Sequence, residues 1–176
     1  MPGFPLTPVE LFQYNHVVTT PQSNPLGDLL TLLSIAPPGS GGTISGIDTA
    51  TNGVTDGDFC YATATANRVA KTDAASIATA RCCGVGTATA GTIRDGDAVG
   101  AAKFTTAGGA PANGDPVYLA LASDDAGTAA GKLTAVPPSA SGQVVAEVGI
   151  CLDNSNYAAF KTCRIAFQVK APVILA

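Results

Sequence analysis

Polar and apolar residues follow a strand-like pattern over most of the chain. From about residue 46 to residue 176, short stretches rich in Thr, Val and Ile alternate with Gly, Asn and Asp at intervals of about 8 to 12 residues. β-Branched residues favour strands, and the intervening small and polar residues favour turns. The pattern predicts a mainly β body over residues 46–176, with less than about 15% helix.

Three short stretches share one pattern: "TDGDF" at 55–59, "RDGDA" at 94–98 and "ANGDP" at 112–116. Gly and Asn adopt positive φ angles at low cost, and the Asp that follows can bond to nearby backbone before a strand begins. A calcium loop would need oxygen ligands at alternating positions over about a dozen residues, and none of the three stretches continues in that way. We therefore interpret them as turns that start strands, and we predict no metal site.

The body contains an internal duplication. Residues 56–86 and 113–151 both begin with a Gly-Asp turn, continue through a strand that contains Tyr, and end in a strand with a central Gly. The matched positions are the pairs Arg68-Val69 and Lys132-Leu133, and the triplets Cys83-Gly84-Val85 and Val148-Gly149-Ile150. Neither copy can bury its apolar face alone. We therefore predict one β-sandwich or small β-barrel domain built from two related β-units.

Residues 1–45 have a different texture and are predicted to form an extended N-terminal arm. Seven of the twelve prolines lie there, and proline removes backbone donors that helices and central strands need. The stretch "DLLTLLSI" at 28–35 is the exception, because Asp28 can cap a short helix that Pro37 and Pro38 would end. The stretch "PPGSGG" at 37–42 is interpreted as a flexible joint.

The short helical stretch of the arm leaves no polar face of useful width, so it must be buried. Docking onto its own domain and docking onto a neighbouring subunit are both compatible with the pattern. These apolar residues of the arm are our candidates for partner binding: Phe12, Leu29, Leu30, Leu32, Leu33 and Ile35.

Charge is sparse. The chain has 9 Lys and Arg against 13 Asp and Glu, and only 12% of its residues are charged. The usual share is about 25%, so we expect neighbouring subunits to cover part of the surface. The basic residues are scattered singly, which argues against nucleic-acid binding. Without an apolar run of about 18 residues or a secretory signal pattern, we expect a soluble protein made in the cytoplasm, with no membrane partner.

No arrangement of residues predicts catalysis or a cofactor. The single histidine, His16, lies in the arm, no G-x-S-x-G motif occurs, and "GVGTATAG" at 84–91 is better explained as a strand end and a loop than as a phosphate site. The cysteines are odd in number and lack Cys-x-x-Cys spacing, so we interpret them as buried free thiols: Cys60, Cys82, Cys83, Cys151 and Cys163. In a strand, the adjacent Cys82 and Cys83 would point to opposite faces.

The stretches "GDPVYLA" and "GKLTAVPPSASGQVVAEVGICLD" within 114–153 carry a resemblance, together with "GDFCYA" at 57–62 and "CRIAFQVKAPVIL" at 163–175. The pattern resembles that of tailed-phage structural proteins, and is similar to small capsid decoration, or cement, proteins and to β-domains of tail fibres. It covers about residues 54–175.

The resemblance implies a bacteriophage virion component without enzymatic activity, made in the cytoplasm of the host bacterium. Such a protein forms a homotrimer on the capsid exterior, binds the major capsid protein and stabilises contacts between capsomers. A tail-fibre or other tail-associated β-domain protein is the alternative. A carbohydrate-binding module or an enzyme is disfavoured, because sugar platforms use exposed aromatic residues and the chain has no Trp.

Overall fold

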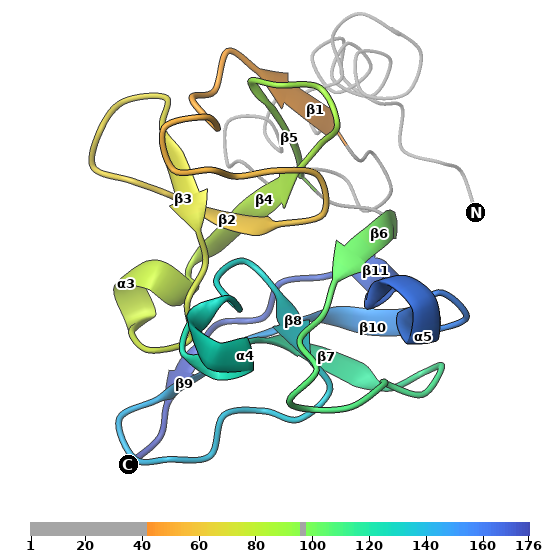
Figure 1. Ribbon diagram of the computed structural model, residues 1–176. Helices are drawn as coiled ribbons and strands as arrows, with labels where there is room; N and C mark the ends of the chain where they lie inside the picture. Colours follow the sequence, from red (N-terminus) through yellow and green to blue (C-terminus); the bar gives the residue numbers. More distant parts are fainter. Residues whose placement is uncertain (1–41, 96–97) are drawn as a thin grey trace, which may run out of the picture. The chain divides into compact units, whose positions relative to one another are not determined.

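The computed structural model describes residues 42–95 and 98–176 (Figure 1). The chain divides into two units, Met1–Ser40 and Gly41–Ala176, and all described residues belong to the second. The candidate partner-binding residues of the arm, from Phe12 to Ile35, lie outside the described residues, as do His16 and the centre of the stretch "RDGDA".

The first half of the body forms one antiparallel five-stranded sheet with the order β1-β5-β4-β2-β3. Its strands are β1 (Gly42–Ser45), β2 (Phe59–Ala62), β3 (Val69–Lys71), β4 (Cys82–Gly86) and β5 (Thr92–Asp95). The single turn of helix α3 (Ile77–Ala80) joins β3 to β4, with Ser76 as its N-cap. Residues 42–45, which the sequence pattern placed at the end of the arm, are thus a strand of the body.

The second half forms another antiparallel five-stranded sheet, with the order β6-β11-β10-β7-β8. Its strands are β6 (Ala98–Lys103), β7 (Pro116–Leu119), β8 (Leu133–Thr134), β10 (Glu147–Asp153) and β11 (Thr162–Phe167). Two short helical turns, α4 (Asp124–Gly127) and α5 (Tyr157–Phe160), lie in its connections, and β9 (Val144–Val145) pairs with β12 (Val173–Ile174). Strand accounts for 38% and helix for 9% of the structure, which confirms the prediction of a mainly β protein.

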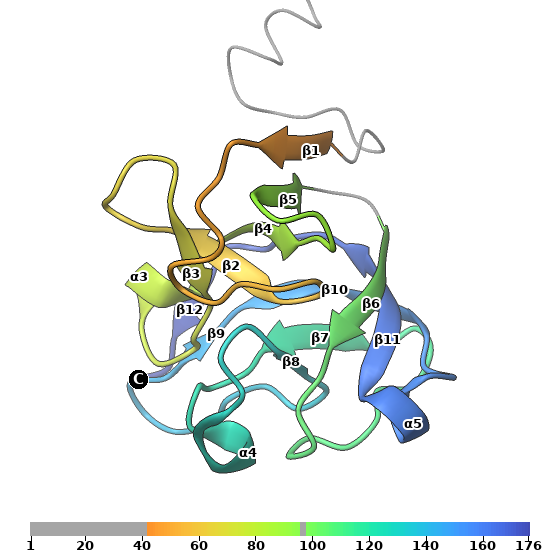
Figure 2. The same ribbon diagram turned by 45° about the horizontal axis from the view of Figure 1, so that its top comes forward.

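The two sheets have the same topology, and this confirms the duplication inferred from the sequence. The first repeat (residues 42–95) and the second repeat (residues 98–167) match strand by strand, so that β1, β2, β3, β4 and β5 correspond to β6, β7, β8, β10 and β11. The colours of Figure 1 follow the chain through the two sheets in turn, and Figure 2 shows β10 beside β11 and β7 in the second sheet.

The pairing registers match as well. In the first repeat, Cys60 lies opposite Gly84 and Phe59 opposite Val85. In the second, Val117 lies opposite Gly149 and Pro116 opposite Ile150. A β-bulge follows at the same place in both pairs of strands. Gly84 and Gly149, which the sequence alignment matched, are therefore structurally equivalent.

Two of the three Asp-Gly or Asn-Gly stretches are turns that lead into a strand, as predicted. Gly57 and Gly114 have φ angles of 78° and 93°, in the region that favours glycine. The Asp58 carboxylate accepts a hydrogen bond from the backbone N–H of Thr55 at 2.9 Å. Asp115 accepts the equivalent bond from Ala112 at 2.8 Å. Strands β2 and β7 begin directly after these turns.

Each sheet curls until its two edges meet. The segment after β1 reaches the start of β3 through a parallel bridge between Asp48 and Arg68. In the second repeat, Phe104, which follows β6, bridges Leu133 of β8 in the same way. Each repeat is thus a strongly curled small sheet, in agreement with the predicted β-sandwich or small β-barrel.

The core follows from this curling. A small cluster of Val54, Cys60, Val69 and Ile93 fills the first repeat. A larger cluster fills the second repeat and also includes Phe59 and Val85, which point out of the first repeat. Cys82 packs against the larger cluster and Cys83 against the smaller one, so the two side chains lie on opposite faces of β4, as predicted.

Candidate functional site

A buried carboxylate lies where the two repeats meet. The side chain of Asp58, at the start of β2, is 2% exposed and forms ion pairs with Lys71 at 3.1 Å and Lys103 at 2.7 Å. Lys71 belongs to the first repeat and Lys103 to the second. The hydroxyl of Thr55 donates a further hydrogen bond at 2.8 Å. The Asp58 carboxylate therefore joins the two repeats electrostatically.

The contacts of Asp58 decide its charge state. Burial by itself would raise the pKa of this carboxyl, because an apolar environment disfavours the ionised form. Hydrogen bonds from Lys103 and Thr55 outweigh burial, and the pKa of Asp58 is lowered below its ordinary value. The carboxylate is therefore ionised at neutral pH.

A second acidic residue, Asp125, repeats this arrangement within the second repeat. Its carboxylate accepts hydrogen bonds from the backbone and the hydroxyl of Thr106, at 2.9 and 2.6 Å, and pairs with Lys132 at 3.2 Å. Asp125 has a φ angle of 50°, in the left-handed region that costs a non-glycine residue energy.

The Lys161 ammonium lies 4.5 Å from the ring centre of Tyr157, in a cation–π contact.

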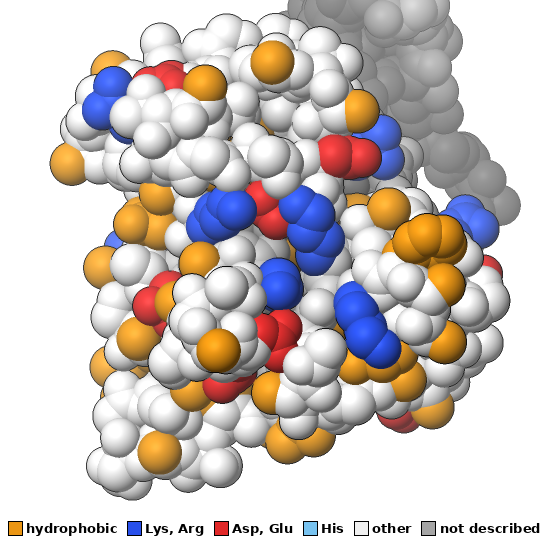
Figure 3. All heavy atoms as spheres, viewed as in Figure 1, with side chains coloured by type: hydrophobic (Ala, Val, Ile, Leu, Met, Phe, Trp, Pro, Cys, Tyr) orange, Lys and Arg blue, Asp and Glu red, His pale blue; other side chains and the backbone are white. Residues whose placement is uncertain are grey.

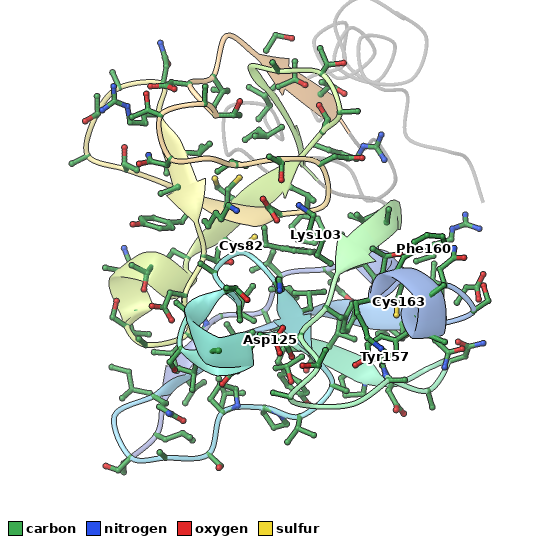
Figure 4. All side chains as sticks on the ribbon, viewed as in Figure 1. Cys82, Lys103, Asp125, Tyr157, Phe160 and Cys163 are labelled. Carbon is green, nitrogen blue, oxygen red and sulfur yellow. The ribbon has the colours of Figure 1, made fainter. Side chains whose placement is uncertain are left out.

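These side chains share one surface. Figure 3 shows lysine and arginine side chains gathered in the middle of one face, with acidic side chains between them, and Figure 4 marks Lys103, Asp125 and Tyr157 on that side. We call the surface formed by Lys71 and Lys103, the two lysines that share the Asp58 carboxylate, the lysine face. Asp58 balances only one of these two positive charges, on a chain whose net charge is −4, so the lysine face suits acidic groups of a protein partner.

The turn of the second repeat that is equivalent to the Asp58 turn has no such ion cluster among the described residues. Asp115 corresponds to Asp58, but it is exposed. Among the described residues it has no salt-bridge partner, and its carboxylate accepts from the backbone of Ala112. The same turn motif is therefore a simple turn in one repeat and part of a buried ion cluster in the other.

The outer faces of the two repeats also differ. In the first repeat, Phe59 and Val85 are 0% and 2% exposed, because the second repeat covers them. At the equivalent place in the second repeat, Pro116 is exposed and Ile150 is 39% exposed. Leu152, two residues further along β10, is 45% exposed. Pro116, Ile150 and Leu152 form what we call the apolar face.

All five cysteines are free thiols; Cys60, Cys151 and Cys163 are buried as the sequence indicated, whereas Cys82 and Cys83 are only half-buried. Burial raises the pKa values of the Cys82 and Cys163 thiols to about 12, and it also raises the pKa of Cys151. A hydrogen bond with Cys83, followed by burial, raises the pKa of Cys60, and the same bond lowers the pKa of Cys83. Only the thiolate is a strong nucleophile, so four of the five side chains have little reactivity at neutral pH.

We expect the folded protein at about pH 8 to react with iodoacetamide on the order of 100-fold more slowly at Cys82 and Cys163 than the unfolded chain does, because few of these thiols are ionised. Peptide mass spectrometry over time would measure the rates, and the chain in denaturant is the control. Cys83, half-buried and with a lowered pKa, should react first. Rapid alkylation of Cys82 or Cys163 in the folded protein would contradict this expectation.

Sequence reasoning missed both surfaces. It interpreted Asp58 as a turn residue, which is correct, but the two lysines approach it only in the folded chain. The stretch "EVGICLD" of β10 did contain a signal, because it has apolar residues at both alternating positions, a pattern typical of strands covered on both sides. Within residues 42–95 and 98–176, no three His, Cys, Asp or Glu side chains gather closely enough to hold a metal ion.

No helix in the described part of the chain is long and apolar enough to cross a membrane. No known protein family, curated protein or solved structure matches the chain.

Proposed function

We propose that this chain is a non-enzymatic structural protein of a tailed-phage virion: a capsid decoration protein that binds the outer capsid surface and stabilises contacts between capsomers. The apolar face carries the proposal. The second repeat covers Phe59 and Val85 of the first repeat. By contrast, Ile150 and Leu152 of the second repeat are exposed to solvent. Exposed apolar strand surfaces of this kind are typical of proteins that act within larger assemblies.

The lysine face supports the same proposal. An acidic protein with one locally basic surface can bind acidic groups of a shell protein in one orientation, since complementary charges fix register more than they add affinity. On a symmetric shell, many copies of a weak contact add up to stable attachment. The major capsid protein is therefore the partner that we propose, with neighbouring copies of the chain as the second.

The direct test is to incubate the purified chain with expanded capsids that lack it, and to pellet the capsids. We expect saturable co-sedimentation, and electron cryomicroscopy of the pellet should show added density over the capsomers. Unexpanded capsids serve as the control. Failure to pellet with expanded capsids would refute the proposal, and density on virions at the tail alone would indicate the tail-associated alternative.

We predict that replacing both Leu29 and Leu33 with Asp weakens capsid binding about 100-fold or more, because a carboxylate in an apolar contact costs several kcal/mol unless the contact opens. The melting temperature should be almost unchanged, because the arm lies in the separate unit Met1–Ser40. Pelleting at a series of concentrations and differential scanning calorimetry would measure the two quantities.

The matched control replaces Thr31 and Ser34 of the same stretch with Asp. This variant has the same added charge but keeps every leucine, so we expect it to bind almost as the wild type does. Full binding by the Leu29→Asp, Leu33→Asp variant would show that the arm does not contact the capsid.

A further inference from the structure

The internal repeat shows what a covering partner for the apolar face would look like. The cross-strand pair of Phe59 and Val85 in the first repeat corresponds to the pair of Pro116 and Ile150 in the second. Both pairs lie next to an equivalent glycine, Gly84 or Gly149, in the same register. The first pair is covered within the chain and the second is not. The molecule therefore contains one covered and one uncovered version of the same surface.

Residues of β6 and β11 supply the cover in the first repeat. The Phe167 ring, at the end of β11, lies 5.7 Å from the ring of Phe59. Val99 of β6 is 5% exposed and belongs to the same core cluster as Val85, and both residues line one cleft. In the first repeat, the cross-strand pair of Phe59 and Val85 is thus covered by the edge strand β6 and its neighbour β11 of the second repeat.

The first repeat presents the equivalent strands, and β1 is the one with an apolar counterpart, because Asp95 stands in the place of Phe167. Val99 pairs with Ile165, and Ile165 with Cys151. Ile44 pairs with Ile93, and Ile93 with Gly86, which occupies the place of Cys151. Ile44 of β1 is therefore the counterpart of Val99. It is 42% exposed, and all four residues of β1 are exposed.

We propose that a second copy of this chain covers the apolar face, with Ile44 and β1 of that copy in the place that Val99 and β6 take inside the chain. The contact is heterologous, since one copy contributes Ile150 and the other Ile44. Each copy then has both surfaces, so the contact repeats from copy to copy, in a ring if the rotation between copies closes and in a filament if it does not. This assignment deepens the proposed function by naming the surface through which copies assemble.

Two single substitutions test the proposal in the full-length protein. The substitutions Ile150→Asp and Ile44→Asp each place a charge in the contact, and each variant alone should sediment as a monomer at concentrations where the wild type is oligomeric. Analytical ultracentrifugation measures the mass. Val136→Asp is the matched control, because Val136 is 59% exposed and lies outside the paired strands. It should remain oligomeric.

Mixing the two variants gives the sharper result. The Ile44→Asp copy retains an intact Ile150 and the Ile150→Asp copy retains an intact Ile44, so one contact can form and cannot repeat to a third copy. We expect a dimer that contains one copy of each variant, visible in the sedimentation profile and in native mass spectrometry. If the contact were isologous, with Ile150 of both copies facing each other, the mixture would stay monomeric.

A wild-type chain that is monomeric at about 100 μM would overturn the proposal, as would two variants that remain oligomeric or a mixture without the dimer. If an Asp variant fails to fold, as judged by its melting curve, Ile150→Thr and Ile44→Thr replace the pair, since Thr keeps the β-branched shape at an exposed strand position. If the chain's own arm covered the apolar face, the wild type would be the monomer. Self-association without capsid co-sedimentation would refute the proposed function but leave this contact standing.

Discussion

Replacing Gly149 with alanine should destabilise the protein by about 3 kcal/mol or more, which corresponds to a fall of about 10 °C in melting temperature. An added Cβ at this position would run into the backbone carbonyl oxygen of Ala166 on the adjacent strand β11. A backbone oxygen cannot rotate away as the end of a side chain can, so the pairing of β10 with β11 has to open. Differential scanning calorimetry would measure the effect.

The control is Gly100→Ala in strand β6, where an added Cβ would meet nothing within 4 Å. This variant should be neutral or slightly more stable, because alanine restricts the unfolded chain. Gly84→Ala, the equivalent change in the first repeat, should resemble Gly149→Ala, since its Cβ would lie 2.8 Å from the carbonyl oxygen of Arg94. Equal stability of the Gly149 and Gly100 variants would show that the two strands are not packed as described.

Replacing Asp58 with Asn should cost about 2 kcal/mol at neutral pH. Loss of one partner from a buried ion pair can cost about 3–5 kcal/mol. The smaller value is expected here because Lys71 and Lys103 are each 32% exposed, so water can solvate their ammonium groups once the carboxylate is gone. Urea unfolding would measure the difference in the free energy of unfolding.

The pH dependence provides a second measurement of the same cluster. The pKa of Asp58 is lowered in the folded protein, so its contribution to stability is fully present above the pKa of the unfolded chain, about 3.9. The contribution is lost as the pH falls through the lower pKa of the folded state. The wild type should therefore lose more stability between neutral and strongly acidic pH than the Asp58→Asn variant does.

Asp115→Asn is the control for both experiments, because Asp115 occupies the equivalent turn and the substitution changes the net charge by the same amount. It is exposed and accepts a backbone hydrogen bond without an ion pair among the described residues. We expect a loss below about 1 kcal/mol. If both variants lost the same stability, the ion cluster would contribute nothing beyond the turn.

The two largest expected effects are those of Gly149→Ala, in the pairing of β10 with β11, and of Asp58→Asn, at the junction of the two repeats. Gly149 adjoins Ile150 of the apolar face, and Asp58 holds the two lysines of the lysine face. Their variants should therefore lose assembly as a consequence of altered structure. Substitutions of Ile150, Ile44 and the arm leucines separate binding from folding, because exposed residues or residues outside the body are changed.

Local patterns along the chain were sufficient to establish the class of the fold and its repeat. Alternating β-branched residues and glycine turns act over a few neighbouring residues, so "TDGDF" and "ANGDP" could be identified as strand starts from the residues alone. The match of Gly84 with Gly149 was equally accessible, because both positions demand a residue without a side chain. The opposite orientation of Cys82 and Cys83 followed from the period of a strand.

Long-range packing, by contrast, governs which copy of each repeated feature has a partner. Asp58 and Asp115 stand in the same local motif, and only Asp58 meets Lys103, which lies 45 residues away in the chain. Val85 and Ile150 are both apolar strand residues beside an equivalent glycine, and only Val85 is covered. Such differences arise from contacts between segments distant in sequence, and a pattern of neighbouring residues contains no information about which of two similar surfaces another segment will cover.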